Sequence, residues 1–131
     1  MVRPTAVVTI FRALADETRL RLFSLMGKDE ICVCYLVEIL GSSQPKISRH
    51  LAYLRRAGLV AARREGKWMH YRVTSPGSEG VRRILNAVRS WLNVDSEMEK
   101  DRQRLARICC SARKPAAVDG APTPARFRDA A

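Results

Sequence analysis

The chain has 131 residues, which is enough for one domain, and its hydrophobic content of 47% is ordinary for a globular protein rather than a disordered one. Its formal net charge of +11 is concentrated in residues 42–74, which hold eight basic residues and one acidic residue, while residues 1–41 are neutral. Such a local excess attracts a polyanion, so the charge pattern favours a nucleic-acid partner over a merely solvated surface.

The sequence also bears on the compartment. No run approaches the roughly 18 apolar residues of a membrane-spanning helix, and no cleavage site follows the short apolar stretch at residues 6–11. We therefore expect a cytoplasmic protein without a membrane partner. In that reducing compartment the cysteines are expected to be thiols.

Apolar residues recur at helical spacing in the first third of the chain and predict three helices. The first spans residues 7–14 and has a broad apolar face that needs a partner surface. The second spans residues 18–26, with Asp16 as its candidate N-cap. The third is short, spans residues 34–40, and ends at Gly41.

Residues 43–57 predict a fourth helix with two different faces. Ser43 can cap its start, and Pro45 is tolerated in the first turn. Apolar residues at spacings i, i+4 and i+7 face the core, and a basic and polar stripe occupies another face. We expect the stripe and the helix start to contact DNA bases or phosphates through Ser43, Gln44, Lys46, Ser48, Arg49 and His50.

After Gly58 the pattern changes from a period of 3.6 to a period of 2 and predicts a β-hairpin over residues 59–73, with its turn at Glu65 and Gly66. We expect the cationic tip to lie against the DNA backbone or minor groove through Arg63, Arg64 and Lys67. Two short helices, a tight turn and a cationic hairpin follow the order of a winged helix-turn-helix. The predicted fold class is mainly α with a small β-hairpin.

Two further helices are predicted beyond the hairpin. An amphipathic stripe runs from residue 81 to residue 92, and a more charged helix spans residues 95–110. Residues 111–131 contain three prolines and no periodic apolar pattern, so we expect a disordered tail. The expected organisation is one domain over residues 1–110, followed by this tail.

The thiols are a second candidate site. Cys32 and Cys34 are two residues apart at the entrance of the third helix, where thiolates can converge on one ion and the helix N-terminus favours the charged form. The alternative is that both are small core hydrophobes. Two other cysteines, Cys109 and Cys110, lie at the end of the last predicted helix.

Four stretches together resemble the ArsR/SmtB family of metalloregulators: residues 14–22 (LADETRLRL), 43–51 (SQPKISRHL), 54–60 (LRRAGLV) and 64–72 (REGKWMHYR). The resemblance covers roughly residues 10–95. It implies a winged-helix homodimer built from the first and fifth helices, which represses a detoxification operon and leaves its operator when an effector binds. In such a dimer the expected interface residues are Val7, Phe11, Leu14, Ile84, Leu85, Val88, Trp91 and Leu92.

Residues 31–36 (ICVCYL) match the Cys-Val-Cys signature of the arsenic-, cadmium- and lead-responsive members of that family. Tyr35 stands where the family typically has Asp, and no third cysteine follows on the same helix. Trivalent arsenic takes three thiolates, so the third sulfur is expected from Cys109 or Cys110, in the same or the other subunit. Adjacent helical positions point about 100° apart, so one of the two is expected to join, not both.

The leading hypothesis is a repressor of a metalloid-resistance operon that binds double-stranded operator DNA as a homodimer. Its effector would be trivalent arsenic (arsenite) or antimonite bound to cysteines, with no organic cofactor. A cadmium-, lead- or redox-responsive repressor and a purely structural DNA binder are the alternatives. A thiol enzyme is disfavoured because we find no phosphate-binding Gly loop and no His available as a general base, so no catalytic residue is expected. The family's zinc site on the fifth helix is not expected, since residues 77–94 contain no His.

Overall fold

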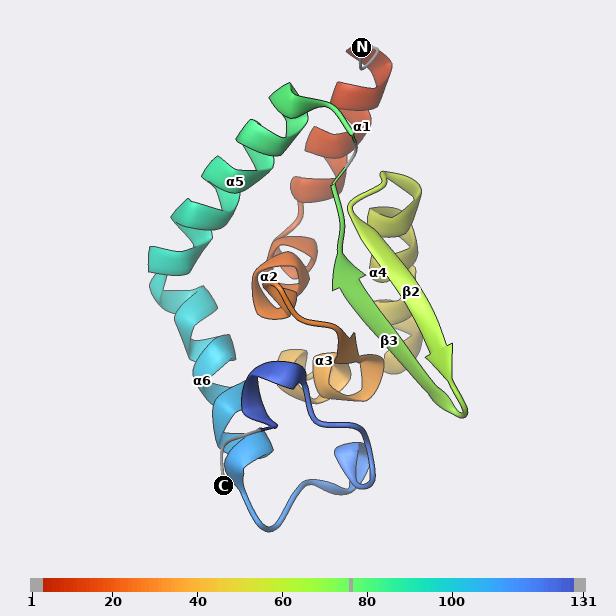
Figure 1. Ribbon diagram of the computed structural model, residues 1–131, viewed down its shortest axis with the longest axis vertical. Coiled ribbons are helices and arrows are strands. Elements are labelled where there is room, and N and C mark those ends of the chain that lie inside the picture. Colours follow the sequence, from red (N-terminus) through yellow and green to blue (C-terminus); the bar gives the residue numbers. More distant parts are fainter. Residues whose placement is uncertain (1–3, 76, 129–131) are drawn as a thin grey trace.

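The computed structural model describes residues 4–75 and 77–128 and is mostly helical, with a small antiparallel sheet at one side (Figure 1). Within these ranges no helix is long and apolar enough to cross a membrane. The predicted fold class, mainly α with a β-hairpin, is confirmed. In chain order the elements are α1 (Pro4–Leu14), α2 (Glu17–Met26), β1 (Ile31–Cys32), α3 (Val33–Leu40), α4 (Gln44–Arg56), β2 (Val60–Glu65), β3 (Trp68–Val73), α5 (Glu79–Val94), α6 (Ser96–Cys110), and the 3₁₀ helices η1 (Ala116–Val118) and η2 (Ala125–Phe127).

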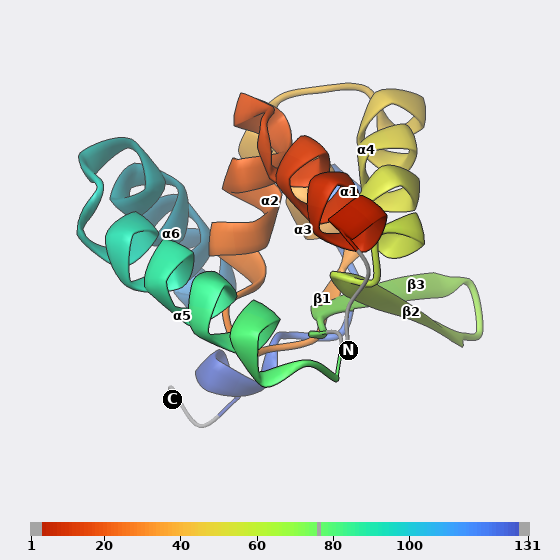
Figure 2. The ribbon, with the colours of Figure 1, turned by 90° about the horizontal axis from the view of Figure 1, so that it is seen from above.

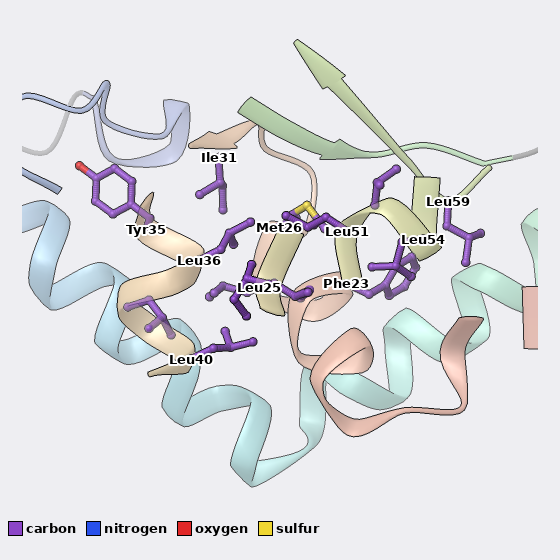
Figure 3. Packing of buried hydrophobic residues seen from close by; sticks show 14 of the residues in the cluster. Phe23, Leu25, Met26, Ile31, Tyr35, Leu36, Leu40, Leu51, Leu54 and Leu59 are labelled. Carbon is purple, nitrogen blue, oxygen red and sulfur yellow. The ribbon is translucent and has the colours of Figure 1, made fainter. Parts of the chain in front are cut away.

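The core is centred on α2, whose residues 22–26 are all buried. Both α3 and α4 pack on α2 and on each other, and Figure 3 shows apolar side chains of all three helices meeting beneath the sheet. Leu51 and Leu54 of α4 have no exposed surface. The apolar side of α4 is therefore held in the core, which fixes the direction in which its polar side points.

The turn between α3 and α4 is determined by local chemistry. Gly41 ends α3 in the left-handed conformation, with φ 65°, and its N–H donates to the carbonyl of Val37 at 3.0 Å. Ser43 then caps α4, because its hydroxyl accepts from the N–H of Lys46 at 3.4 Å. These two caps leave a short connection, as the sequence predicted.

The sheet has the strand order β1–β3–β2, and both pairings are antiparallel. Glu65 pairs with Trp68, so the hairpin loop is Gly66–Lys67, one residue later than the predicted turn. Gly66 has a φ of 58°, which the first residue of a favoured two-residue loop requires. Strand β1 was not predicted, because two residues are too few for an alternating pattern.

Helices α5 and α6 form a layer on the other side of α2 from α4 and the hairpin (Figure 2). Asp101 of α6 is buried, and its carboxylate accepts two hydrogen bonds from the guanidinium of Arg21 on α2, at 2.8 and 2.9 Å. A bidentate pair of this kind satisfies the buried carboxylate and sets the position of α6 along α2.

The C-terminal segment, residues 111–128, corrects the expectation of a disordered tail. It contains η1 and η2, and Val118 is fully buried. Pro115 and Pro124 precede the two 3₁₀ helices, and helices of three residues are too short to give a periodic pattern. Figure 1 shows the segment turning back from α6 and running below α3, and η1 packs on α3. Residues 129–131 of the expected tail lie outside the described residues.

Arg126 fastens this segment to the end of α2. Its guanidinium donates to the carboxylate of Asp29 at 2.5 Å and to the carbonyls of Leu25 and Met26 at 3.0 and 2.8 Å. We predict that Arg126→Ala raises the rate of limited thermolysin cleavage within residues 111–128 on the order of tenfold, because these bonds oppose local opening. Arg128→Ala is the control, since the Arg128 guanidinium donates to the Thr123 carbonyl, within the same segment, at 3.1 Å. Equal cleavage rates in the two variants would contradict the anchoring role.

Candidate functional site

The thiols of Cys32 and Cys34 lie together at the start of α3. Cys32 is the N-cap residue, with extended backbone, and Cys34 is the second residue of the helix. Their sulfurs are 3.0 Å apart, and the Cys34 thiol donates to Cys32 Sγ. Both are free thiols rather than half of a disulfide. Cys32 is only 1% exposed, and Cys34 is half-buried. At this separation one atom can bond both sulfurs.

The two thiols are not equivalent. The hydrogen bond from Cys34 lowers the pKa of Cys32 to about 7, against the effect of burial, and backbone hydrogen bonds from Cys34, Met69 and Val33 lower it further. The pKa of Cys34 is raised well above its usual value, first by that same hydrogen bond and then by burial. The pair therefore loses its first proton from Cys32, at about pH 7, while Cys34 keeps its proton.

A cavity of about 290 Å³ opens beside the pair. Its walls come from the end of β1, the first half of α3, the start of α4, the hairpin and η1. The lining residues are Cys32, Val33, Cys34, Val37, Gln44, Lys67, Trp68, Met69 and Ala117. Apart from the thiols, Gln44 and Lys67, the lining side chains are apolar. The cavity thus joins the thiol pair to both elements that were predicted to contact DNA.

Cys109 and Cys110 do not join this pair within the protomer. Cys109 is buried on α6, while Cys110 is exposed, and among the described residues no three Cys, His, Asp or Glu side chains are close enough to share a metal ion. Burial raises the pKa of Cys109 to about 11, so it is a neutral thiol at pH 7. The pKa of Tyr35 is raised to about 12, first by burial and then by charge on Cys109. Of the two, Cys109 is thus the cysteine on the side of α3, near Tyr35.

The outward side of α4 carries the predicted DNA-contacting residues. Gln44, Lys46 and Arg49 are exposed, while Ser48 and His50 are half-buried. The Nδ1 atom of His50 lies 3.3 Å from Nη1 of Arg19, so its ring is directed toward α2. The surface is therefore basic at the residues nearest solvent.

A hollow of about 530 Å³ on this side has lining residues that the sequence analysis did not select. Arg19 of α2 lies over the ring of Tyr53, with 4.2 Å between its Cζ atom and the ring centroid. Arg56 also lies over that ring, at 5.8 Å. Arg56 follows Tyr53 at i+3, so helical spacing could have identified it. No sequence signal places Arg19 there, because α2 reaches the hollow only through tertiary packing.

The three predicted wing residues differ in their surroundings. Arg64 and Lys67 are exposed, and the ammonium of Lys67 lies 4.9 Å from the centroid of the Trp68 ring. Arg63 is also exposed, but it is paired within the protomer, with its Nη2 atom 2.6 Å from Oε1 of Glu30. Glu30 directly precedes β1, so this ion pair connects the wing to the strand that carries Cys32. Sequence reasoning missed Glu30, since nothing local distinguishes it.

The expected interface residues divide into two groups. Leu14, Leu85 and Leu92 are buried within the protomer. Phe11 and Trp91 are 50% and 76% exposed, and they line an apolar groove of about 450 Å³ between α1 and α5. Val7, Ile84 and Val88 are partly buried. Large exposed aromatic side chains on an apolar groove are typical of a protein–protein contact.

Comparisons with known proteins identify the family of this chain. Residues 16–62 match the model of the family described as "Bacterial regulatory protein, arsR family". The chain is 41% identical over 105 residues to the "Arsenical resistance operon repressor" of Escherichia coli (strain K12), an alignment covering 79% of this chain and 88% of that protein. It is 44% identical over 92 residues to the "Arsenic resistance transcriptional regulator ArsR1" of Pseudomonas putida, covering 66% of this chain and 72% of that one.

Solved structures give the same result. HlyU from Vibrio cholerae N16961 superposes with a TM-score of 0.58 at 31% identity, covering 66% of this chain and 91% of that one. The AntR antimony-specific transcriptional repressor superposes with a TM-score of 0.53 at 30% identity, covering 68% and 78%. These similar proteins are transcriptional regulators rather than enzymes. The chain is a winged helix-turn-helix protein and belongs to the arsR family of bacterial regulatory proteins.

Proposed function

We propose that this protein is a metalloid-responsive transcriptional repressor. It binds double-stranded operator DNA as a homodimer and leaves it when trivalent arsenic or antimony bonds to the thiols of Cys32 and Cys34. The observation that carries the proposal is the 3.0 Å separation of the two sulfurs at the start of a helix that packs on the DNA-reading helix. The names of the similar repressors, which mention arsenical resistance and antimony, support the effector class.

DNA binding rests on α4 and the wing. The exposed side chains of Gln44, Lys46 and Arg49 suit base edges and phosphates in the major groove, and Ser43 lies at the helix start, where N–H groups favour a phosphate. Arg64 and Lys67 suit the adjacent backbone or minor groove. Pairing of two copies through the exposed aromatic groove of α1 and α5 would space two α4 helices one DNA turn apart, roughly 34 Å.

Metalloid capture depends on the different pKa values of the two thiols. The Cys32 thiolate attacks arsenic, forms a sulfur–arsenic bond and displaces hydroxide. The Cys34 thiol then condenses with a second arsenic hydroxyl, giving a second sulfur–arsenic bond and one water. A third bond to Cys109 or Cys110, from this subunit or the other, would complete the site, and Cys109 is the better candidate because it already lies near α3 through Tyr35.

Release of operator DNA follows from the packing of the elements around the thiol pair. Closing two sulfur–arsenic bonds pulls the first turn of α3 against its N-cap, and α3 packs directly on both α4 and β3. Strand β1 pairs with β3 at Cys32 and His70, so the wing shares the displacement. A change in the relative position of the α4 helices and wings of the two subunits weakens their simultaneous binding to the operator.

Substitution of Arg49 tests the proposed DNA-binding surface. We predict that Arg49→Ala weakens operator binding about tenfold to hundredfold and lowers the dependence of affinity on salt, because a cation facing DNA is removed. Fluorescence anisotropy of labelled operator DNA at several salt concentrations measures both. Lys100→Ala is the matched control, since Lys100 is an exposed cation on α6 that pairs with Glu97 at 3.1 Å. Equal losses in both variants would indicate a general charge effect and contradict the placement of the DNA surface.

Substitution of Cys34 tests the proposed effector site. We predict that Cys34→Ser abolishes release of operator DNA by arsenite or antimonite and leaves binding by the apoprotein intact, because one of the two bonding sulfurs is lost. Cadmium, lead and peroxide are tested in the same assay, which separates the metalloid hypothesis from metal or redox sensing. Arsenite-driven release that persists in this variant would be evidence against the proposed site.

The pKa of Cys32 gives a pH prediction. Because this pKa is lowered to about 7, the thiolate is lost as pH falls through 7, and the initial rate of arsenite capture should fall with it. Cys34→Ala removes the donor of the hydrogen bond, so the pKa of Cys32 should rise toward the ordinary value of a cysteine, near 8.5. The thiolate absorbance of the wild type minus that of Cys32→Ser gives the midpoint directly. A wild-type midpoint already near 8.5 would show that the hydrogen bond is not made in solution.

A further inference from the structure

We propose that Glu30 limits the affinity of this protein for DNA, because its carboxylate holds the guanidinium of Arg63 away from the phosphates that the wing contacts. The inference rests on the proposed function, since it takes the wing as a DNA-contacting element, and it names a residue that sets the strength of that contact. Arg63 is one of the three wing cations that the sequence predicted to contact DNA.

Each nitrogen of the Arg63 guanidinium has a carboxylate oxygen within hydrogen-bond distance. Nε donates to both oxygens of Glu30, each at 3.0 Å, and Nη2 donates to Oε1 of Glu30 at 2.6 Å. Nη1 donates to Glu65 at 3.4 Å, and Glu65 in turn lies 3.3 Å from Nε2 of the buried His70. The positive charge of Arg63 is therefore offset by carboxylates, and its donors are occupied.

The other two wing cations have different surroundings. Arg64 is exposed, and its side chain forms no hydrogen bond or ion pair within residues 4–75 and 77–128. The ammonium of Lys67 lies 4.9 Å from the centroid of the Trp68 ring, a contact that leaves its charge unneutralised. Arg64 and Lys67 can therefore bind phosphates without losing an ion pair, whereas Arg63 must first leave Glu30.

The ion pair between Glu30 and Arg63 is exposed enough to be exchanged for a phosphate. The side chain of Arg63 is 50% exposed and that of Glu30 is 28% exposed. Ion pairs near the surface contribute little to stability, and a phosphate accepts two hydrogen bonds from a guanidinium as a carboxylate does. The hydrogen bond from Arg63 lowers the pKa of Glu30, so the competing carboxylate is ionised near neutral pH. DNA therefore competes with Glu30 for the same donors.

Glu30 also lies outside the hairpin that contacts DNA. It directly precedes β1, whose Cys32 pairs with His70 of β3, and His70 pairs with Arg63 of β2. The carboxylate thus reaches Arg63 from the opposite edge of the sheet. Removal of its charge changes neither the hairpin loop nor a cation that faces DNA, so the effect on Arg63 can be measured without altering the wing itself.

Glu30→Gln keeps the size of the side chain and removes its charge. The probes are two labelled duplexes of equal length, one from the region upstream of the protein's own gene and one of unrelated sequence. We expect Glu30→Gln to bind both duplexes about threefold to tenfold more tightly, because a phosphate contact does not depend on sequence. The plot of log affinity against log salt should steepen by about 0.9, the value for one added phosphate contact. Fluorescence anisotropy at several salt concentrations measures both quantities.

The double variant Glu30→Gln, Arg63→Ala separates release of Arg63 from simple removal of a negative charge. In the Arg63→Ala background, Glu30→Gln should change the affinity less than about twofold and leave the salt dependence as it was. Glu79→Gln is the matched control, because Glu79 forms a similar exposed pair with Arg83, at 3.1 Å, at the start of α5. This control should bind DNA as the wild type does.

Unchanged or weaker binding by Glu30→Gln would overturn the inference, and weaker binding would show that the ion pair instead holds the wing in place. Equal tightening with and without Arg63, or in the Glu79→Gln control, would also overturn it, because the effect would then be one of general charge. If the wild type binds both duplexes equally, the proposed function fails, while the effect of Glu30 on affinity is still measured on either duplex.

Discussion

The pairing of β1 with β3 is the constraint on which the arrangement of this protein depends. Two residues, Ile31 and Cys32, are hydrogen-bonded into the sheet opposite Tyr71 and His70. The strand ends where α3 begins, so the same residue is a sheet partner of the wing and the N-cap of a core helix. A thiol at this position cannot be displaced without disturbing the wing, the helix or both. The ion pair between Glu30 and Arg63 adds a side-chain connection across the same sheet.

The chemistry of the thiol pair follows from that position. The extended backbone at Cys32 and the helical backbone at Cys34 turn both side chains to one side, where one sulfur donates a hydrogen bond to the other. Above pH 7 the pair is one thiolate and one thiol that share a proton, which suits a condensation that needs a nucleophile at its first step. The pKa of Cys109 is instead raised to about 11, first by burial, so this thiol stays protonated near neutral pH.

The C-terminal segment links parts of the molecule that are far apart in sequence. It leaves α6 after Cys109, packs on α3, lines the thiol cavity and is fastened to the end of α2 by Arg126. The helix that carries the second pair of cysteines is thereby joined to the cavity of the first. The two places are therefore connected both along the chain and by packing.

The helices, the hairpin and the basic surface of α4 could be predicted from the sequence, because caps, apolar spacing and charge are properties of neighbouring residues. Ser43, the stripe from Lys46 to His50 and the glycine at the hairpin loop were all readable in this way. Tertiary structure alone decided that Ile31 and Cys32 form a strand, that Glu30 occupies Arg63, that Arg19 reaches Tyr53, and that Cys109 stays apart from the thiol pair. Each of these contacts joins segments that are distant in sequence. Apolar periodicity predicts secondary structure within one segment, so it cannot predict such contacts.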